Sequence, residues 1–231
     1  MTQKEPQSNT NAYTSGKPDM VYDNIAESWY NRRHWTRFRS ELASLAERWQ
    51  SGRLLNIGCA HGPDFLPFGK SFRLVGLDVS SGMLRMGLKY RKKHGFEADL
   101  VQADARHLPF ADRSFDWAIA MATYHHIGSR EERKAAFTEL RRVLKPEGEA
   151  FITVWNRWQP KFWTRGKETL VPWRTRHGTF DRYYYLFSRR EMAAELRAAD
   201  FELIRILPRT SLHSPFAAFA PNICLHIRKT S

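Results

Sequence analysis

The sequence predicts an α/β protein with a doubly wound, seven-stranded and mostly parallel sheet, and three observations carry that prediction. Short apolar segments alternate with helix-like segments between residues 53 and 155, as expected for parallel strands joined by helices. A Gly-rich turn follows the first apolar segment, and the second one ends in a carboxylate. Two late apolar segments, 201–207 and 223–227, predict an antiparallel hairpin that closes the sheet.

The segments before the sheet are a tail and a helical region. Residues 1–19 are polar and lack an apolar core, so we expect a disordered tail that is neither a signal peptide nor a membrane anchor. Apolar residues at helical spacing then predict two helices between residues 20 and 49, laid over one end of the sheet. The residues with this spacing are Ile25, Trp29, Phe38, Leu42, Leu45 and Trp49.

The alternating region and the end of the chain follow in order. The strands predicted there are 53–57, 73–78, 98–103, 115–122 and 149–155. The helices between them are expected to begin at Gly62 and to span 80–93 and 130–144. Ser80 suits an N-cap, and the segment Lys145-Pro146-Glu147-Gly148 ends the last of these helices. A basic and aromatic insertion over 157–187 and a helix over 188–199 complete one domain, expected over residues 20–231.

Composition limits the classes of protein that the chain can represent. With 231 residues, 42% of them apolar, the chain can bury the core of one α/β domain. No apolar run reaches the roughly 18 residues that a membrane span needs, so we expect no membrane contact. Cys59 and Cys224 lie far apart in the sequence, which favours a reducing, cytoplasmic location with no disulfide framework and no metal site.

The charge of the chain points to a polyanionic partner. There are 37 Lys and Arg against 24 Asp and Glu, a net charge of +13, and the pI is about 10.0. The basic excess is greatest over 157–190, where aromatic residues lie between the cations. The basic residues there are Arg157, Lys161, Arg165, Lys167, Arg174, Arg176, Arg182, Arg189 and Arg190, against the acids Glu168 and Asp181. Cations for phosphates and rings for unpaired bases predict an RNA surface, and a solvated basic face is the alternative.

The Gly-rich turn predicts a nucleoside-binding site. Gly58 and Gly62 in Leu54–Phe65 (LLNIGCAHGPDF) permit a sharp turn and a close approach of the backbone to a ligand. Asp78 ends the next strand, where its carboxylate can accept both hydroxyls of a ribose. Asp104 ends the third strand, where it can accept the exocyclic amine of adenine.

Taken together, the segments LLNIGCAHG, GLDVS, QADARHLPFADRSFD and ELRRVLKPEG resemble the class I S-adenosylmethionine-dependent methyltransferases over residues 20–156. Asn56 and Ala60 stand where that family usually has an acidic residue and a third glycine. The resemblance implies S-adenosyl-L-methionine as the cofactor. The positions that it implies for cofactor binding are Tyr22, Asn56, Gly58, Cys59, Ala60, Gly62, Asp78, Val79, Met83, Asp104, Ala105 and Ala122.

Further segments are similar to one family within that class, the tRNA wobble-uridine carboxymethyl O-methyltransferases. They are VYDNIAESW with Arg33 nearby, MATYHHIGSREERKAAFTELRRVLKP, TVWN and DRYYYLF. The resemblance implies methyl transfer to the carboxylate of a carboxymethyluridine in a tRNA anticodon loop, with a small zinc-binding activator subunit as a partner. Glu132 stands where this family usually has Arg.

A carboxylate acceptor sets the chemistry expected of the catalytic residues. It is already nucleophilic at pH 7, so catalysis would come from positioning and not from a general base. Arg33 and Arg182 are the candidates to hold it, because a planar guanidinium fixes a carboxylate in one orientation. His125 and His126 follow the fourth strand and are expected to face the methyl-transfer site.

Each of these assignments has a structural alternative. Arg33 can face solvent in its basic cluster, and the two histidines can be satisfied by the backbone. Tyr22 can cover the methionine part of the cofactor or only fasten the N-terminal helix. The rings of 183–185 can be strand packing, and Arg133 can pair on its own helix.

Three functions remain open from the sequence. The first is a tRNA methyltransferase, for which we expect a positive cleft bounded by residues 157–190 and the N-terminal helix. The second is a small-molecule methyltransferase, which predicts an apolar acceptor pocket under the 157–187 insertion. The third is a binding protein with the same fold and no catalysis, which would fail to bind S-adenosylmethionine.

Overall fold

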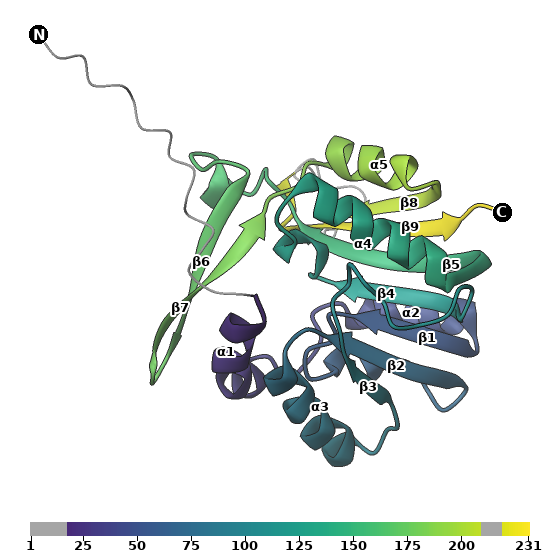
Figure 1. Cartoon of the computed structure of the whole chain (residues 1–231), viewed down its shortest axis with the longest axis horizontal. Coiled ribbons are helices and arrows are strands. Elements are labelled where there is room, and N and C mark those ends of the chain that lie inside the picture. Colours follow the sequence, from purple (N-terminus) through teal and green to yellow (C-terminus); the bar gives the residue numbers. More distant parts are fainter. Residues whose placement is uncertain (1–17, 209–218) are drawn as a thin grey trace, which may run out of the picture.

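The computed structural model describes residues 18–208 and 219–231, so the tail expected over 1–19 lies outside the described residues up to residue 17. A seven-stranded sheet forms its centre (Figure 1). The strands of this sheet are β1 (Gly52–Ile57), β2 (Phe72–Asp78), β3 (Asp99–Gln102), β4 (Phe115–Met121), β5 (Leu144–Trp155), β8 (Phe201–Pro208) and β9 (Asn222–Lys229).

The strand order is β3-β2-β1-β4-β5-β9-β8. The five strands from β3 to β5 pair in parallel, whereas β9 pairs antiparallel with both β5 and β8. This arrangement confirms the doubly wound, mostly parallel sheet and its antiparallel last hairpin. Because the order reverses between β1 and β4, the carboxyl ends of these two strands border the crevice where such sheets bind ligands.

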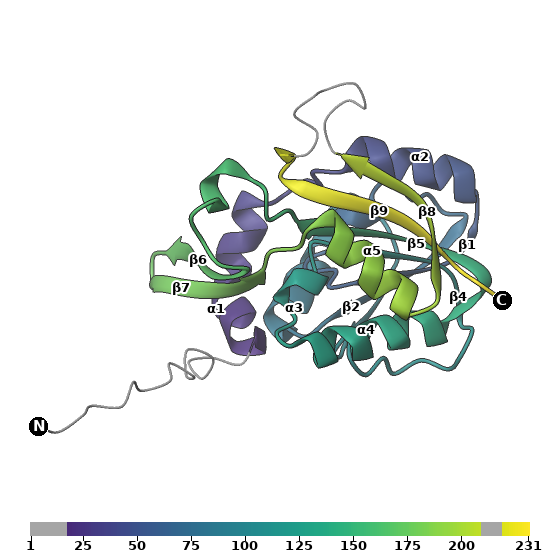
Figure 2. The same cartoon turned by 90° about the horizontal axis from the view of Figure 1, so that it is seen from above.

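Helices cover both faces of the sheet (Figure 2). The helices are α1 (Pro18–Arg32), α2 (Arg39–Trp49), α3 (Ser81–His94), α4 (Arg130–Val143) and α5 (Arg189–Ala198). Along β1 the side chains alternate: Leu55 and Ile57 share a buried cluster with α4 and α5, and Leu54 shares another with α2 and α3. None of these helices is long and apolar enough to cross a membrane.

The helix expected from Gly62 is not an α-helix, and this prediction was wrong. A short 3₁₀ turn, η1 (Pro63–Phe65), stands there. Pro67 gives the reason, because an α-helix needs its missing N–H to bond the carbonyl of Pro63. Phe65 is buried in the apolar cluster on the α2 face, so the turn after the Gly-rich loop is anchored in the core by this side chain.

The 157–187 insertion forms an antiparallel hairpin outside the main sheet (Figure 1). After a short turn, η3 (Pro160–Phe162), its strands are β6 (Glu168–Thr175) and β7 (Gly178–Tyr185). The hairpin packs on α1, where the Trp173 indole lies 4.8 Å from that of Trp29 and donates to the Ser28 hydroxyl at 3.1 Å. The insertion and the N-terminal helix therefore form one layer beside the carboxyl ends of the strands (Figure 2).

Candidate functional site

The loop after β1 turns sharply through residues with left-handed backbone. Gly58, Ala60 and Gly62 have φ angles of +70°, +47° and +87°. A Cβ on Gly58 would lie 2.4 Å from Oγ1 of Thr123, so the neighbouring side chain requires glycine there. Thr123 in turn donates to the Ile57 carbonyl at 2.8 Å, which fastens the loop to the end of β4. The expected turn is present, and its tightest contact is with the protein itself.

Asp78, at the end of β2, holds this loop from the side. Its Oδ2 accepts the N–H of Ala60 at 2.8 Å, and its Oδ1 accepts the N–H of Ser80 at 2.9 Å. Burial raises the pKa of this carboxyl to about 6, against the pull of these two N–H donors. Each oxygen still has acceptor capacity, so the ionised carboxylate suits the two hydroxyls of a ribose.

Asn56 contributes an unpaired amide at the end of β1. The side chain is fully buried, and neither its Oδ1 nor its Nδ2 has a hydrogen-bond partner among the described residues. A buried amide without partners costs stability, which makes it a place for a polar ligand group. The residues around the loop therefore fit a nucleoside cofactor that also carries a polar group for the Asn56 amide.

The remaining residues expected to bind the cofactor differ in what they offer. The side chains of Cys59 and Met83 are buried in apolar clusters, so Cys59 can serve a ligand only through its backbone. The Val79 carbonyl accepts the Gln102 amide, and the Ala122 N–H donates to Thr153. Ala105 packs against the main core.

Asp104 is engaged by a neighbouring guanidinium. Arg106 pairs with it at 2.6 Å and also pairs with Glu132, so one cation bridges two carboxylates. Despite partial burial, the hydrogen bonds from Arg106 hold the pKa of Asp104 below its ordinary value. Asp104 therefore stays ionised at neutral pH. Sequence reasoning missed the role of Arg106, although its place two residues after Asp104 was a usable signal.

Consecutive residues of α1 contact both sides of the site. The Tyr22 hydroxyl donates to Nε2 of His126 at 3.0 Å, and it lies close enough to Asp78 to interact with it electrostatically. Asp23 accepts the Ser80 hydroxyl at 2.6 Å and the Gly82 N–H at 2.7 Å at the start of α3. The helix is thereby attached to the β2 end of the crevice and to the turn after β4. Asp23 carried no signal in the sequence.

His125 and His126 lie on the short turn η2 (Tyr124–His126) after β4. His126 donates from Nδ1 to the Tyr183 carbonyl at 2.8 Å, and Nδ1 of His125 accepts the Trp155 N–H at 3.1 Å. Burial lowers the pKa of His126 to about 4 and that of His125 well below its ordinary value. Both rings are therefore neutral at pH 7, and the buried Nε2 of His125 has no partner among the described residues.

Arg182, on β7, is a buried cation held by aromatic rings. The residue is only 5% exposed. Its guanidinium lies 4.9 Å from the centre of the Trp173 ring and 5.5 Å from that of the Trp29 ring. One nitrogen donates to the Tyr184 hydroxyl at 2.7 Å, and Nε has no hydrogen-bond partner among the described residues. No carboxylate among the side chains that the structure describes forms an ion pair with this guanidinium.

Arg33 reaches the same pair of rings from the end of α1. Its guanidinium lies 5.7 Å from Trp29 and 5.7 Å from Trp173. It is half-buried and has no ion pair with the described carboxylates. The structure thus brings together Arg33 and Arg182, the two arginines selected from the sequence. They meet on the rings of Trp29 and Trp173, which the sequence did not connect with them.

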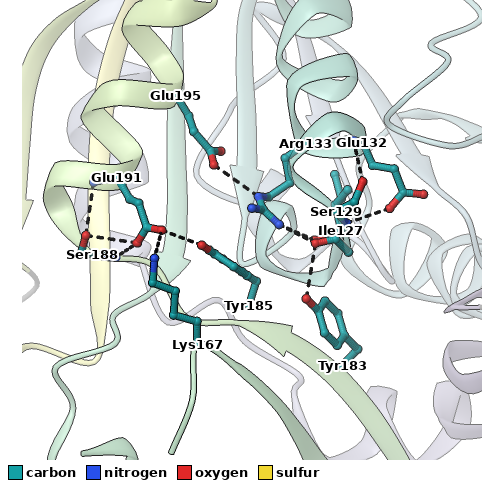
Figure 3. Close-up of polar contacts among 11 residues, drawn as sticks. Ile127, Ser129, Glu132, Arg133, Lys167, Tyr183, Tyr185, Ser188, Glu191 and Glu195 are labelled. Carbon is teal, nitrogen blue, oxygen red and sulfur yellow. Dashed lines mark hydrogen bonds and ion pairs between the residues drawn. The ribbon is translucent and has the colours of Figure 1, made fainter. Parts of the chain in front are cut away.

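Behind this pocket, a network centred on Arg133 fixes β7 to the histidine turn (Figure 3). The Arg133 guanidinium lies 3.8 Å over the Tyr185 ring, donates to the Gly128 carbonyl at 2.5 Å and pairs with Glu195 of α5 at 3.5 Å. Tyr183 donates to the same Gly128 carbonyl at 3.4 Å. Arg133 therefore pairs with another helix instead of its own, which sequence reasoning did not foresee.

A sheet of this order, with a Gly-rich loop, a strand-end carboxylate and a covered crevice at its switch point, is that of a class I methyltransferase. A protein-family model described as "Methyltransferase domain" matches residues 55–152. The CcbJ methyltransferase of Streptomyces caelestis superposes with a TM-score of 0.77 at 14% identity, over 94% of this chain and 100% of that one. That likeness concerns the fold.

Curated relatives define the family. An Encephalitozoon cuniculi protein named "Putative methyltransferase" is 34% identical over 68% of this chain and 72% of its own length. The Arabidopsis thaliana tRNA (carboxymethyluridine(34)-5-O)-methyltransferase is 36% identical over 58% of this chain, but the match spans only 31% of that relative. The chain belongs to the S-adenosylmethionine-dependent methyltransferases, and S-adenosyl-L-methionine is the cofactor of that family.

Proposed function

We propose that this enzyme methylates the carboxylate of a carboxymethyl-modified wobble uridine in tRNA. The observation that carries the proposal is the Arg182 guanidinium, which is buried on aromatic rings and has no carboxylate partner among the described side chains. A buried cation without an anion is costly unless a ligand supplies the anion. The relatives named as tRNA carboxymethyluridine methyltransferases support the choice of acceptor.

Within this proposal, the acceptor carboxylate binds between Arg182 and Arg33, both of which contact the rings of Trp29 and Trp173. Two guanidinium groups can hold its oxygens in one orientation, and the rings exclude water around them. The carboxylate is ionised at pH 7 and attacks without a base, which agrees with the lowered pKa of His126, about 4, because such an imidazole is a weak base. His126 and Tyr22 then act as hydrogen-bonding groups that shape the pocket.

The cofactor supplies an electrophilic methyl group on a sulfonium. We assign its ribose to Asp78, because the ionised carboxylate has free acceptor capacity at the end of β2. We assign its amino-acid part to the unpaired amide of Asn56 and the backbone of 58–62. We assign its adenine base to Asp104, which follows β3 and whose carboxylate is oriented by Arg106.

The small-molecule alternative predicts an apolar pocket under the insertion. The rings there do form apolar walls, but three guanidinium groups, those of Arg32, Arg33 and Arg182, lie over Trp173. A cationic pocket favours an anionic acceptor over a neutral metabolite. The tRNA part of the proposal draws further support from the net charge of +13.

The test uses purified protein, radiolabelled S-adenosylmethionine and bulk tRNA whose methyl esters have been removed by mild alkali. We expect label on the tRNA that base releases again, as an ester must, and no label with untreated RNA of a non-tRNA source. An Arg182→Met variant serves as the matched control and should bind cofactor but label tRNA about 100-fold more slowly. Label that resists base, or label only on small acceptors, would overturn the proposal.

The family resemblance adds one partner to this proposal, a small zinc-binding activator subunit. Among the described residues, no group of three His, Cys, Asp or Glu side chains is arranged to hold a metal ion, so zinc would belong to the partner. The labelling experiment is therefore run with and without such a subunit. Its stimulation of base-labile labelling supports this part of the proposal, and equal labelling in both arms contradicts it.

A further inference from the structure

A cavity of about 640 Å³ lies beside the N-terminal end of α5. Its walls come from the start of the insertion, the turn before β6 and the exposed side of α5. None of the residues assigned above to the cofactor or the acceptor lines it. This cavity is bounded by α5, whereas Arg182 and Arg33 lie between the insertion and α1, so the basic residues of the insertion divide between two places.

The cavity is strongly cationic. Its basic lining residues are Arg157, Lys167, Arg189, Arg190 and Arg197, and its acidic one is Glu191. The carboxylate of Glu191 is already engaged by the Lys167 ammonium at 2.6 Å, the Tyr185 hydroxyl at 2.6 Å and the Ser188 N–H at 3.2 Å (Figure 3). It therefore neutralises Lys167, and Arg157, Arg190 and Arg197 form no ion pair with a carboxylate that the structure describes. Arg190 and Arg197 are exposed on α5.

An exposed aromatic ring completes the cavity. Trp158 is 49% exposed, although a free indole of this size is usually buried. The Arg157 guanidinium lies 5.4 Å from its ring, and Trp163 donates to its carbonyl at 2.9 Å, which fixes the backbone of the turn. An open indole among cations is suited to stack on an unpaired base while the cations bind the adjoining phosphates.

The position of the cavity connects it with the acceptor pocket. Ser188 lies six positions after Arg182, so the Cα atoms of these two residues are at most about 20 Å apart. Strand β7 runs from one to the other, and the Arg133 network holds its far end against α4 and α5. A single RNA strand of a few nucleotides can therefore contact both at once.

From this placement we propose that the α5 cavity binds an unpaired stretch of the RNA substrate, with phosphates on Arg157, Arg190 and Arg197 and one base stacked on Trp158. This inference rests on the proposed function, because it takes the RNA whose modified uridine enters the Arg182 pocket as its ligand. It assigns a docking role that is separate from methyl transfer. The cavity raises the affinity for RNA and leaves the chemical step unchanged.

The test compares two double variants that remove the same charge. Arg190→Gln/Arg197→Gln changes the cavity, and Lys70→Gln/Arg73→Gln changes exposed cations at the start of β2, the opposite edge of the sheet from the crevice. The probe is fluorescein-labelled bulk tRNA, with Kd measured by anisotropy at several salt concentrations. We expect the cavity variant to bind about ten-fold more weakly and to lose roughly one to two units of the salt slope. The control should change Kd less than two-fold.

Two further readouts separate this inference from the reaction itself. Trp158→Ala should weaken binding of a single-stranded RNA oligonucleotide about five-fold and leave that of a duplex of equal length unchanged. Because both measurements follow binding, a cavity variant that loses affinity supports the docking site even if no tRNA is ever methylated. Equal weakening by both double variants, an unchanged Kd, or a lowered kcat with normal KM would overturn it.

Discussion

Two buried arginines, one in the acceptor pocket and one in the network behind it, have opposite surroundings. Arg133 has a carboxylate partner in Glu195 and two backbone carbonyls, those of Ile127 and Gly128, as acceptors. Arg182 interacts with two tyrosine hydroxyls, those of Tyr184 and Tyr22, and its Nε has no hydrogen-bond partner among the described residues. Both lie against aromatic rings, so the difference lies in the anion and not in the stacking.

This difference separates architecture from function. A buried ion pair whose groups are satisfied can be retained by the fold alone, whereas an unpaired buried charge needs a ligand to compensate it. Asn56 in the cofactor site and His125 beside the acceptor site also carry buried polar atoms without partners among the described residues, as does one oxygen of Glu195 in the Arg133 network. The network around Arg133 instead joins α4, α5 and β7 (Figure 3). Substitutions should therefore affect stability in one region and activity in the other.

The largest effect is expected for Arg133→Met. It removes one half of a buried pair and leaves the Glu195 carboxylate uncompensated, which should lower the free energy of unfolding by about 3–5 kcal/mol in urea titrations. The double variant Arg133→Met/Glu195→Met should recover most of that loss. A loss below about 1 kcal/mol would show that the network is not what holds β7 in place.

Arg182→Met should produce the reverse pattern. We expect kcat/KM for tRNA to fall about 100-fold, equivalent to about 2.7 kcal/mol, because the acceptor loses its charge-assisted hydrogen bonds. The free energy of unfolding should change by less than about 1 kcal/mol, since methionine can fill the space between the rings. Destabilisation as large as that of Arg133→Met would erase the contrast between the two regions.

Cofactor affinity should depend on pH through Asp78. Because burial raises the pKa of this carboxyl to about 6, protonation below pH 6 removes the ionised acceptor, and Kd for S-adenosylmethionine should rise up to about ten-fold per pH unit. Asp104 keeps a lowered pKa and adds nothing over this range. In calorimetric titrations, Asp78→Asn should bind weakly at every pH. A flat wild-type profile down to pH 5 would remove Asp78 from the cofactor site.

The smallest effect is expected for Tyr22→Phe. It deletes the hydrogen bond to His126 and the contacts of the same hydroxyl with Arg182 and Tyr184, and should lower kcat/KM about five-fold, which corresponds to about 1 kcal/mol. Tyr30→Phe, on the same helix but packed against His61 and Tyr90, is the control and should leave kcat/KM unchanged. Equal losses in both variants would assign the effect to the packing of α1.

The sequence predicted the sheet well because its signals are local. Strand periodicity, the Ser80 cap and the Gly-rich turn each depend on neighbouring residues, and Ser80 does accept the Met83 N–H at 3.0 Å. The helix expected from Gly62 failed although Pro67 was a local signal against it.

Contacts between distant elements could not be predicted in this way. Arg33 and Arg182 were selected as acceptor-binding residues by chemistry, but their meeting on Trp29 and Trp173 depends on how the hairpin packs against α1. The pairing of Arg133 with Glu195 joins residues 62 positions apart. Such pairs follow from tertiary packing, for which hydrophobic periodicity carries no information.

The attachment of α1 has a thermodynamic consequence. Tyr22 forms a hydrogen bond with His126 beside the acceptor pocket. Asp23 forms hydrogen bonds with Ser80 and Gly82 beside the cofactor loop. Because the two residues are consecutive on one rigid helix, a ligand that shifts α1 on one side changes the other side as well. The affinities for cofactor and acceptor are then coupled, and each ligand must alter the affinity for the other by the same factor.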